Sequence, residues 1–203
     1  MSTCRFAGVQ PGAFVSRAAR LPCLFAGSLF MSFAGQTAVT AGQGASFTVI
    51  SPGAADGAFL TKRNAASTRD CGGEDVSPPI AWSQAPAGTQ SHAVVMTDPD
   101  GGKGLGSVHW VAYGIASSTS TLGEGAGMAD KSLFVGGTNS RDTLAYAGPC
   151  PPIGDQPHHY VFSVYALDLK PGTLPPGLTR DALLQAIRGH VLAEASIVLR
   201  YAR

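Results

Sequence analysis

The chain has 203 residues, of which 13% are charged and 44% hydrophobic, and it contains 26 glycines and 14 prolines. This composition excludes a disordered, charge-rich protein and predicts one folded domain, or at most two small ones, with many turns. The formal net charge of +1 offers no general electrostatic attraction to polyanions, which excludes a protein that binds nucleic acid through its overall charge.

Residues 1–41 have the pattern of a secretory signal peptide. Arginines without any acidic residue precede an uncharged run at 21–35, and small residues at 39–41 suit cleavage before Gly42. The run is shorter than the roughly 20 apolar residues of a membrane-spanning helix. Cys23 lacks the small preceding residue that lipidation requires. We expect a periplasmic or secreted domain at 42–203; an uncleaved anchor or a wrongly assigned start codon would also fit the pattern.

Five segments of residues 42–203 have the composition of β-strands. They are rich in β-branched and aromatic residues, and turn residues separate them. The predicted strands are residues 46–51, 92–98, 108–115, 158–168 and 195–201. The fourth is the longest and has apolar residues on both faces, so we expect it to lie centrally in a sheet.

One helix is predicted between the last two strands. Thr179 is a suitable N-cap, and Asp181 suits the first turn. An apolar stripe follows at Leu183, Leu184, Ile187 and Val191. Strands joined by Gly- and Pro-rich loops, with one late helix, indicate a mainly β, mainly antiparallel domain.

Cleavage of the signal peptide would leave two cysteines, Cys71 and Cys150. Their spacing matches neither a CxxC redox motif nor a zinc site. In an oxidising compartment, two free buried thiols and a single disulfide are both compatible with the residues. Only the distance between the two Cα atoms decides between these alternatives.

Polar residues gather where the predicted strands begin and end. An Asp-Pro-Asp turn at 98–100 ends one strand, and His109 lies near the start of the next. His158 and Tyr160 share one face of their strand, whereas His159 points to the other. Each has an ordinary structural interpretation, as a turn, a half-buried histidine or a core aromatic residue. They form a site only if the segments meet in space.

A series of short motifs gives these residues a common context. The motifs are Val76-Ser-Pro-Pro-Ile-Ala-Trp82, Pro86-Ala-Gly-Thr89, Asp98-Pro-Asp100, His109-Trp-Val111, Gly137-Thr-Asn139, Tyr146-Ala-Gly-Pro-Cys-Pro-Pro152 and His158-His-Tyr160. In this order and spacing, the chain resembles the phosphatidylethanolamine-binding protein family, in its bacterial Raf-kinase-inhibitor-like branch. The resemblance covers about residues 45–202, and the ordered series is far more specific than any single motif.

The resemblance implies a large central antiparallel sheet, a smaller sheet packed on it, and peripheral helices, including one near the C-terminus. It also implies a small pocket for anions such as phosphate or phospholipid head groups. The matching pocket residues are Asp98, Asp100, His109, Pro151, His158 and Tyr160. It further implies a non-enzymatic module without a cofactor that binds lipid or inhibits a kinase or peptidase. In this branch, Cys71 and Cys150 are expected to form a disulfide.

The residue chemistry suits such a pocket. His109, His158 and Tyr160 can donate hydrogen bonds to a phosphate. A carboxylate that accepts from an imidazole N–H fixes the tautomer and favours the protonated ring, and it can pair with an ammonium directly. A pocket that holds both signs of charge suits a zwitterion better than a bare anion.

Five residues depart from the family pattern. Gly101-Gly102 stands where Ala-Pro is common, which predicts a looser loop. Ser107 replaces a bulky aromatic residue, Asp75 an asparagine and Asp142 a glycine. We expect these changes to affect the ligand and not the fold.

A metal-dependent hydrolase is the competing function. Three histidines and two aspartates are available at the predicted site, but no HxxxH spacing is present. Only one of His158 and His159 can face any single site. A serine hydrolase is less well supported still, because no Gly-x-Ser-x-Gly motif occurs. The metal content of the purified protein would distinguish a hydrolase from a binding protein.

Overall fold

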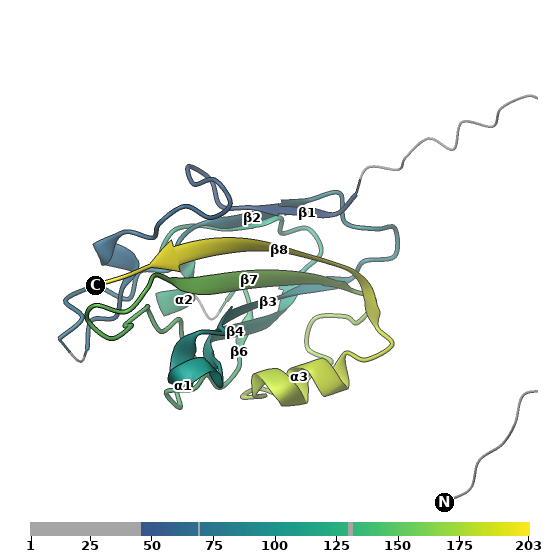
Figure 1. The fold of residues 1–203 in the computed structure, drawn as a ribbon. Coiled ribbons are helices and arrows are strands. Elements are labelled where there is room, and N and C mark those ends of the chain that lie inside the picture. Colours follow the sequence, from purple (N-terminus) through teal and green to yellow (C-terminus); the bar gives the residue numbers. More distant parts are fainter. Residues whose placement is uncertain (1–45, 69, 130–131) are drawn as a thin grey trace, which may run out of the picture. The chain divides into compact units, whose positions relative to one another are not determined.

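Within residues 46–68, 70–129 and 132–203, which the computed structural model describes, the chain forms eight strands and a few short helical elements (Figure 1). The strands are β1 (Thr48–Ile50), β2 (Ile80–Ser83), β3 (Ser91–Asp98), β4 (Ser107–Ala116), β5 (Thr121–Leu122), β6 (Val135–Gly136), β7 (His158–Leu167) and β8 (Val191–Tyr201). The helical elements are the 3-10 turn η1 (Lys62–Asn64) and the helices α1 (Gly101–Gly104), α2 (Ala126–Ala129) and α3 (Arg180–Ala186).

The strands form two antiparallel sheets. The large sheet has the order β6-β4-β3-β7-β8, and the small sheet has the order β1-β2-β5. This confirms the predicted mainly β fold, in which a smaller sheet packs on a larger one. The five predicted strands are present, with ends that differ from the prediction by at most four residues.

The large sheet is buried on both faces, which explains why β3 reads as a nearly continuous apolar run. One face packs against the small sheet, and this cluster includes Ile80, Trp82, Met96, Trp110 and Phe162. The other face is covered by α3, and this second cluster includes Val95, Val111, Leu183 and Ile187. Burial of both faces rather than one gives the sheet the rigidity on which the loops at its end rest.

Two sequence-based predictions about these elements are wrong in detail. The fourth predicted strand, β7, is not central: it lies between β3 and β8, and β3 is the middle strand of the sheet. The predicted helix ends early, because Val191 is not part of its apolar stripe but the first residue of β8, opposite Leu167. Gly189 has a φ of +83°, a left-handed conformation that ends the helix and reverses the chain.

The helix start agrees with the prediction. The Thr179 side chain accepts a hydrogen bond of 3.3 Å from the Ala182 N–H, and Asp181 lies in the first turn. This N-cap satisfies one of the amide groups that the helix leaves without an internal partner.

The pairing register brings several loops to one end of the large sheet. Asp98 at the end of β3 pairs with Ser107 at the start of β4, and Thr97 pairs with Val161 near the start of β7. The turn that contains α1 and the Pro-rich loop before β7 therefore lie at the same end, as Figure 1 shows. This end carries the predicted site.

The expected signal peptide, residues 1–41, lies outside the described residues. Gly42–Arg203 forms one compact unit. In the described part of the chain, no helix is long and apolar enough to span a membrane.

Candidate functional site

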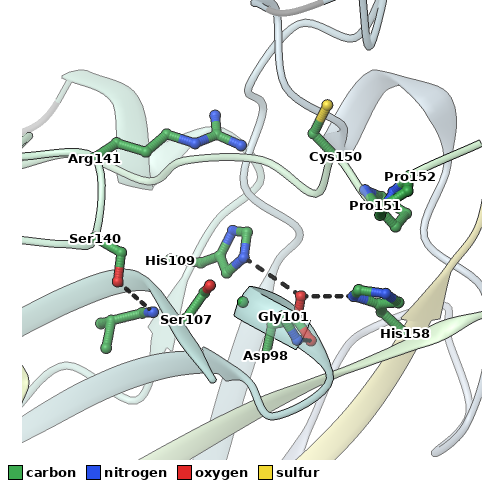
Figure 2. A pocket seen from close by; sticks show the side chains of 12 residues that line it. Asp98, Gly101, Ser107, His109, Ser140, Arg141, Cys150, Pro151, Pro152 and His158 are labelled. Carbon is green, nitrogen blue, oxygen red and sulfur yellow. Dashed lines mark hydrogen bonds and ion pairs between the residues drawn. The ribbon is translucent and has the colours of Figure 1, made fainter. Parts of the chain in front are cut away.

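A cavity of about 210 Å³ opens at this end of the large sheet. Residues of α1, the starts of β4 and β7, the loop after β6 and the Pro-rich loop all contribute to it (Figure 2). The lining residues are Asp98, Gly101, Gly102, Ser107, Val108, His109, Ser140, Arg141, Cys150, Pro151, Pro152 and His158. The cavity is large enough for one phosphate group and a short attached chain.

Asp98 is the buried centre of the site, with 4% of its surface exposed. Its Oδ1 accepts hydrogen bonds from the backbone N–H groups of Asp100, at 3.0 Å, and Gly101, at 2.9 Å. This is the local turn that an Asp-Pro-Asp sequence favours. Oδ2 remains available, and in Figure 2 it lies between the rings of His109 and His158.

His158 donates to this carboxylate. Its Nδ1 lies 2.9 Å from Asp98 Oδ2, and both side chains are buried. Because a carboxylate only accepts, Nδ1 carries the proton, and Nε2 is the ring atom left for a ligand. Nε2 lies 3.8 Å from Oδ2 of Asp155, a more exposed acidic residue three positions earlier in the chain.

His109 was expected to donate a hydrogen bond to a ligand, but the structure makes it an acceptor. Its Nδ1 donates to the backbone oxygen of Ala147 at 2.6 Å, so Nε2 carries no proton in the neutral ring. Burial lowers the pKa of His109 more than the Ala147 and Asp98 oxygens raise it. At neutral pH this ring is therefore an acceptor, with Nε2 at 3.9 Å from Asp98 Oδ2, and not the expected imidazolium donor.

Tyr160 lies under the site and does not line the cavity. It is fully buried. Its ring packs edge-on against the His109 ring, with 5.3 Å between the ring centroids, and stacks on the His158 ring, with 6.4 Å between the centroids. Burial, together with the Asp98 charge, raises the pKa of its hydroxyl. Tyr160 therefore supports the two imidazoles rather than contacting a ligand in this cavity.

Asp100 also lies outside the cavity lining. Its exposed carboxylate accepts from the His159 backbone N–H at 2.8 Å and from the His159 Nδ1 at 2.9 Å. Both hydrogen bonds lower the pKa of Asp100, and the one from the backbone N–H has the larger effect. His159 points away from His158, as the strand alternation predicts. Of the six predicted pocket residues, the cavity thus brings together Asp98, His109, Pro151 and His158.

The sequence analysis did not identify Arg141 as a site residue. The backbone N–H of Arg141 donates to the Asn139 side chain at 2.8 Å, in a turn that aims the guanidinium over the cavity. One of its nitrogens donates to the Gly148 backbone oxygen at 2.9 Å. The available signal was an arginine next to the Gly137-Thr-Asn139 motif in a chain with few charges. Ser107 and Ser140 add hydroxyl groups to the same wall.

The Pro-rich loop is held in place by a disulfide and by a carboxylate. The structure joins Cys71 and Cys150, whose Cα atoms are 5.6 Å apart. Asp75, the residue that replaces an asparagine, accepts from the Gly148 N–H at 2.7 Å and from Ser67. Burial opposes ionisation of Asp75, but these hydrogen bonds outweigh it and lower its pKa. Pro151 is thereby fixed against the cavity.

At Gly101, the first residue of the Gly101-Gly102 sequence, the surroundings leave no room for a side chain. A methyl group at Gly101 would lie 2.7 Å from Ser107 Oγ and 2.9 Å from Asp98 Oδ2. The loop is thus not simply looser than in an Ala-Pro sequence, because Gly101 is packed directly against the site. Gly102 has a φ of +58°, which a glycine adopts without strain.

The cavity combines groups of opposite preference. Arg141 and the two serine hydroxyls can donate to an anion, whereas Asp98 and the unprotonated His109 Nε2 can accept from a cation. Within the described residues, no group of three or more His, Cys, Asp or Glu side chains is arranged to hold a metal ion. The arrangement suits a small zwitterion.

Comparisons with known proteins agree with this fold. Residues 50–202 match the family described as phosphatidylethanolamine-binding protein. A UPF0098 protein of Aquifex aeolicus is 40% identical over 134 residues, which cover 66% of this chain and 78% of the relative. A Mycobacterium tuberculosis relative, provisionally designated lipoprotein LppC, is 38% identical over 151 residues, or 74% of this chain and 70% of LppC.

A solved structure is similar over nearly its whole length. Escherichia coli YbcL, described as a new member of the mammalian PEBP family, superimposes with a TM-score of 0.72 at 32% identity. The match covers 78% of this chain and 99% of YbcL. Because sequence motifs, fold and family match coincide over most of its length, the chain belongs to the phosphatidylethanolamine-binding protein family.

Proposed function

We propose that this protein is a non-enzymatic binding protein for a phosphorylated head group that also carries an ammonium, such as phosphoethanolamine in a phosphodiester. The observation that carries the proposal is the pairing of a cation, Arg141, with a buried carboxylate, Asp98, in one cavity of about 210 Å³. The phosphate would accept from Arg141, and the ammonium would donate toward Asp98 and the His109 Nε2.

Binding rather than hydrolysis is favoured by how the acidic and basic groups are occupied. Asp98 already accepts two backbone N–H groups and the His158 ring, and the His109 Nδ1 proton is held by a backbone oxygen. These bonds orient the side chains, and the one unprotonated ring nitrogen that they leave, the His109 Nε2, is assigned in this proposal to the ammonium and not to an attacking water. No observation favours the metal-dependent hydrolase, and metal analysis of the purified protein tests it.

Titration calorimetry with glycerophosphoethanolamine tests the proposal. His158→Ala removes the ring that donates to Asp98 and so orients the carboxylate assigned to the ammonium, and we therefore expect affinity to fall about ten- to a hundredfold. His159→Ala, the neighbouring residue on the other face, is the matched control and should bind like the wild type. Arg141→Gln should weaken the binding of glycerophosphoethanolamine. Equal affinity of the wild type and His158→Ala would refute the site.

We further propose that the protein is exported. This rests on the signal-peptide pattern of residues 1–41 and on the lipoprotein designation of the Mycobacterium tuberculosis relative. N-terminal sequencing of protein from the cell envelope should begin near Gly42. An intact Met1 on soluble protein from the cell interior would contradict export.

A further inference from the structure

Two apolar side chains project into solvent much further than any others of their size in the described chain. Leu105 is 92% exposed and Ile153 is 80% exposed, whereas the next large apolar residue, Ile50, is 57% exposed. Leaving a leucine and an isoleucine this exposed forgoes burial energy, and such residues mark interaction surfaces when they gather at one place.

Both residues are close along the chain to residues that line the cavity, and Leu105 lines a second hollow that shares Asp98, Ser107, Val108 and Ser140 with it. Leu105 lies between Gly102 and Ser107, which line the cavity from one side. Ile153 directly follows Pro152, which lines it from the other side. The two loops lie at the same end of the large sheet, where β3 ends and β7 begins (Figure 1).

The backbone around each residue is held by hydrogen bonds. Before Leu105, Gly102 and Lys103 both have left-handed conformations, with φ of +58° and +60°, and the Gly106 N–H closes the turn on the Gly101 oxygen at 2.9 Å. This geometry directs Leu105 outward. Such a conformation costs a non-glycine residue such as Lys103 energy, so the shape of this turn is imposed by its surroundings.

The Pro-rich loop is restrained in a similar way. Arg203 donates from Nε to the Pro151 oxygen at 2.7 Å, and the Gly154 N–H reaches the Arg203 oxygen at 3.3 Å. Ile153 lies between these two anchored positions. Its exposure is therefore a property of a fixed loop.

The charges around the mouth are mixed. Lys103, Arg141 and Arg203 lie with Asp155 and Asp100 on the same loops and strand ends, so neither sign of charge dominates. A strongly charged partner of either sign would not be favoured by this surface. Two single side chains on either side of a polar opening also lack the broad, flat apolar area of a stable protein–protein interface. These two separate side chains are better suited to a lipid surface, into which each can insert independently of the other.

From these observations we infer that the protein docks mouth-first on a zwitterionic phospholipid bilayer. Leu105 and Ile153 enter the boundary between head groups and acyl chains, and the cavity receives the head group of a lipid that remains in the bilayer. This inference rests on the proposed function, since it names the bilayer as the source of the head group. The balanced charge implies that docking depends little on salt.

Tryptophan fluorescence gives a direct test. The two native tryptophans, Trp82 and Trp110, are buried, so a new tryptophan reports on its own position. Leu105→Trp in the full chain is mixed with vesicles of phosphatidylethanolamine and phosphatidylcholine whose acyl chains are brominated. Contact of the indole with these chains should quench its fluorescence strongly.

The matched control is Leu192→Trp. Leu192 is a half-exposed apolar residue at the start of β8, which the register places at the opposite end of the large sheet from His158. Its fluorescence should not be quenched. Equal quenching of both variants, or of neither, would overturn mouth-first docking.

A second pair of measurements separates this inference from the proposed function. Leu105→Ser combined with Ile153→Ser should partition about tenfold less onto these vesicles than the wild type. It should still bind soluble glycerophosphoethanolamine with wild-type affinity, as judged by calorimetry. Wild-type vesicle binding by the double variant would overturn the inference and leave the proposed function standing.

Two other results would also overturn the inference. If neither protein binds the soluble head group, the proposed function fails and the inference fails with it. If the double substitution changes the oligomeric state in sedimentation, the surface is an interface between copies of the chain and not a bilayer-docking surface.

Discussion

Two histidine–aspartate pairs are built from the same two short segments, yet they lie in different surroundings. Asp98 pairs with His158 and Asp100 with His159, each with an Nδ1–Oδ2 distance of 2.9 Å. The first pair has side-chain exposures of 10% and 5%, and the second has 53% and 43%. Both pairs have the same chemistry, but only the buried one is shielded from water and borders a cavity.

The difference shows that the surroundings of an ion pair matter more than its geometry. An exposed pair is screened by solvent and adds little to stability. Breaking a buried pair leaves an uncompensated polar group, which is costly. The buried pair can therefore orient a ring for a ligand, whereas the exposed pair only ties a turn to a strand.

The largest expected effect comes from deleting each carboxylate. Asp98→Ala leaves the Gly101 N–H and the His158 ring without their acceptor, so we expect a loss of about 3–5 kcal/mol in the free energy of unfolding. Asp100→Ala should cost at most about 1 kcal/mol. Urea denaturation of both variants measures the difference. Similar losses would show that burial does not separate the pairs.

The disulfide should matter mainly to the buried pair. It closes a loop of 79 residues and holds the loop in which Pro151 lies beside the cavity. Replacing Cys71 and Cys150 by alanine should cost about 2–4 kcal/mol and weaken head-group binding. Thiol labelling of the unfolded, unreduced mature protein, from which cleavage before Gly42 has removed Cys4 and Cys23, should detect no cysteine. Two reactive thiols would contradict the bridge.

A smaller effect is expected from crowding the buried pair. Gly101→Ala places a methyl group against Ser107 and Asp98, and we expect it to cost about 1–3 kcal/mol. The control is Gly123→Ala, because a methyl group at Gly123 meets no atom within 4 Å. Thermal unfolding compares the two variants. A Gly101→Ala protein as stable as this control would mean that the site adapts without strain.

A third histidine sharpens the comparison, since His92 is buried without any acid. It packs against the rings of Phe47 and Trp82. Burial lowers its pKa below the ordinary value of 6.5, and the backbone of Ala116 opposes this only in part.

The sign of the pH effect follows from this shift. The unfolded chain binds the His92 proton more readily, so stability should fall as the pH drops below about 6.5, by at most about 1.4 kcal/mol per pH unit. His92→Leu should remove this part of the dependence, leaving that of His109. The contribution of His92 is measured by comparing the free energies of unfolding of the wild type and His92→Leu between neutral and acid pH. Parallel curves would show that His92 does not contribute.

Much of the fold was predictable from local patterns. Long strands such as β3 and β7 carry enough β-branched and aromatic residues to be recognised. The missed strands β2, β5 and β6 have four residues or fewer, too short to show a period. The helix was extended too far because Val191 continues its apolar spacing, and the Gly189 turn outweighs that spacing.

The site was predictable in part. The resemblance identified Asp98, His109, Pro151 and His158 correctly as cavity residues. Tyr160 shares the face of His158, but it stands two residues further along β7, where that face is already covered by the core. Arg141 was missed because its position depends on a turn held by Asn139, which no strand pattern describes.

The amino-acid sequence by itself determined which residues alternate along each strand, where the chain turns, and that His158 and His159 face opposite sides, because these properties depend only on neighbouring residues. The tertiary structure decided which of the two histidine–aspartate pairs is buried. Burial depends on distant segments: the Pro-rich loop, tied to Cys71 and Asp75, lines the cavity together with His158, whereas His159 on the opposite side of the strand is exposed. The ionisation of His109 was decided in the same way, because its shielding and the backbone oxygen that holds its proton come from outside its own strand.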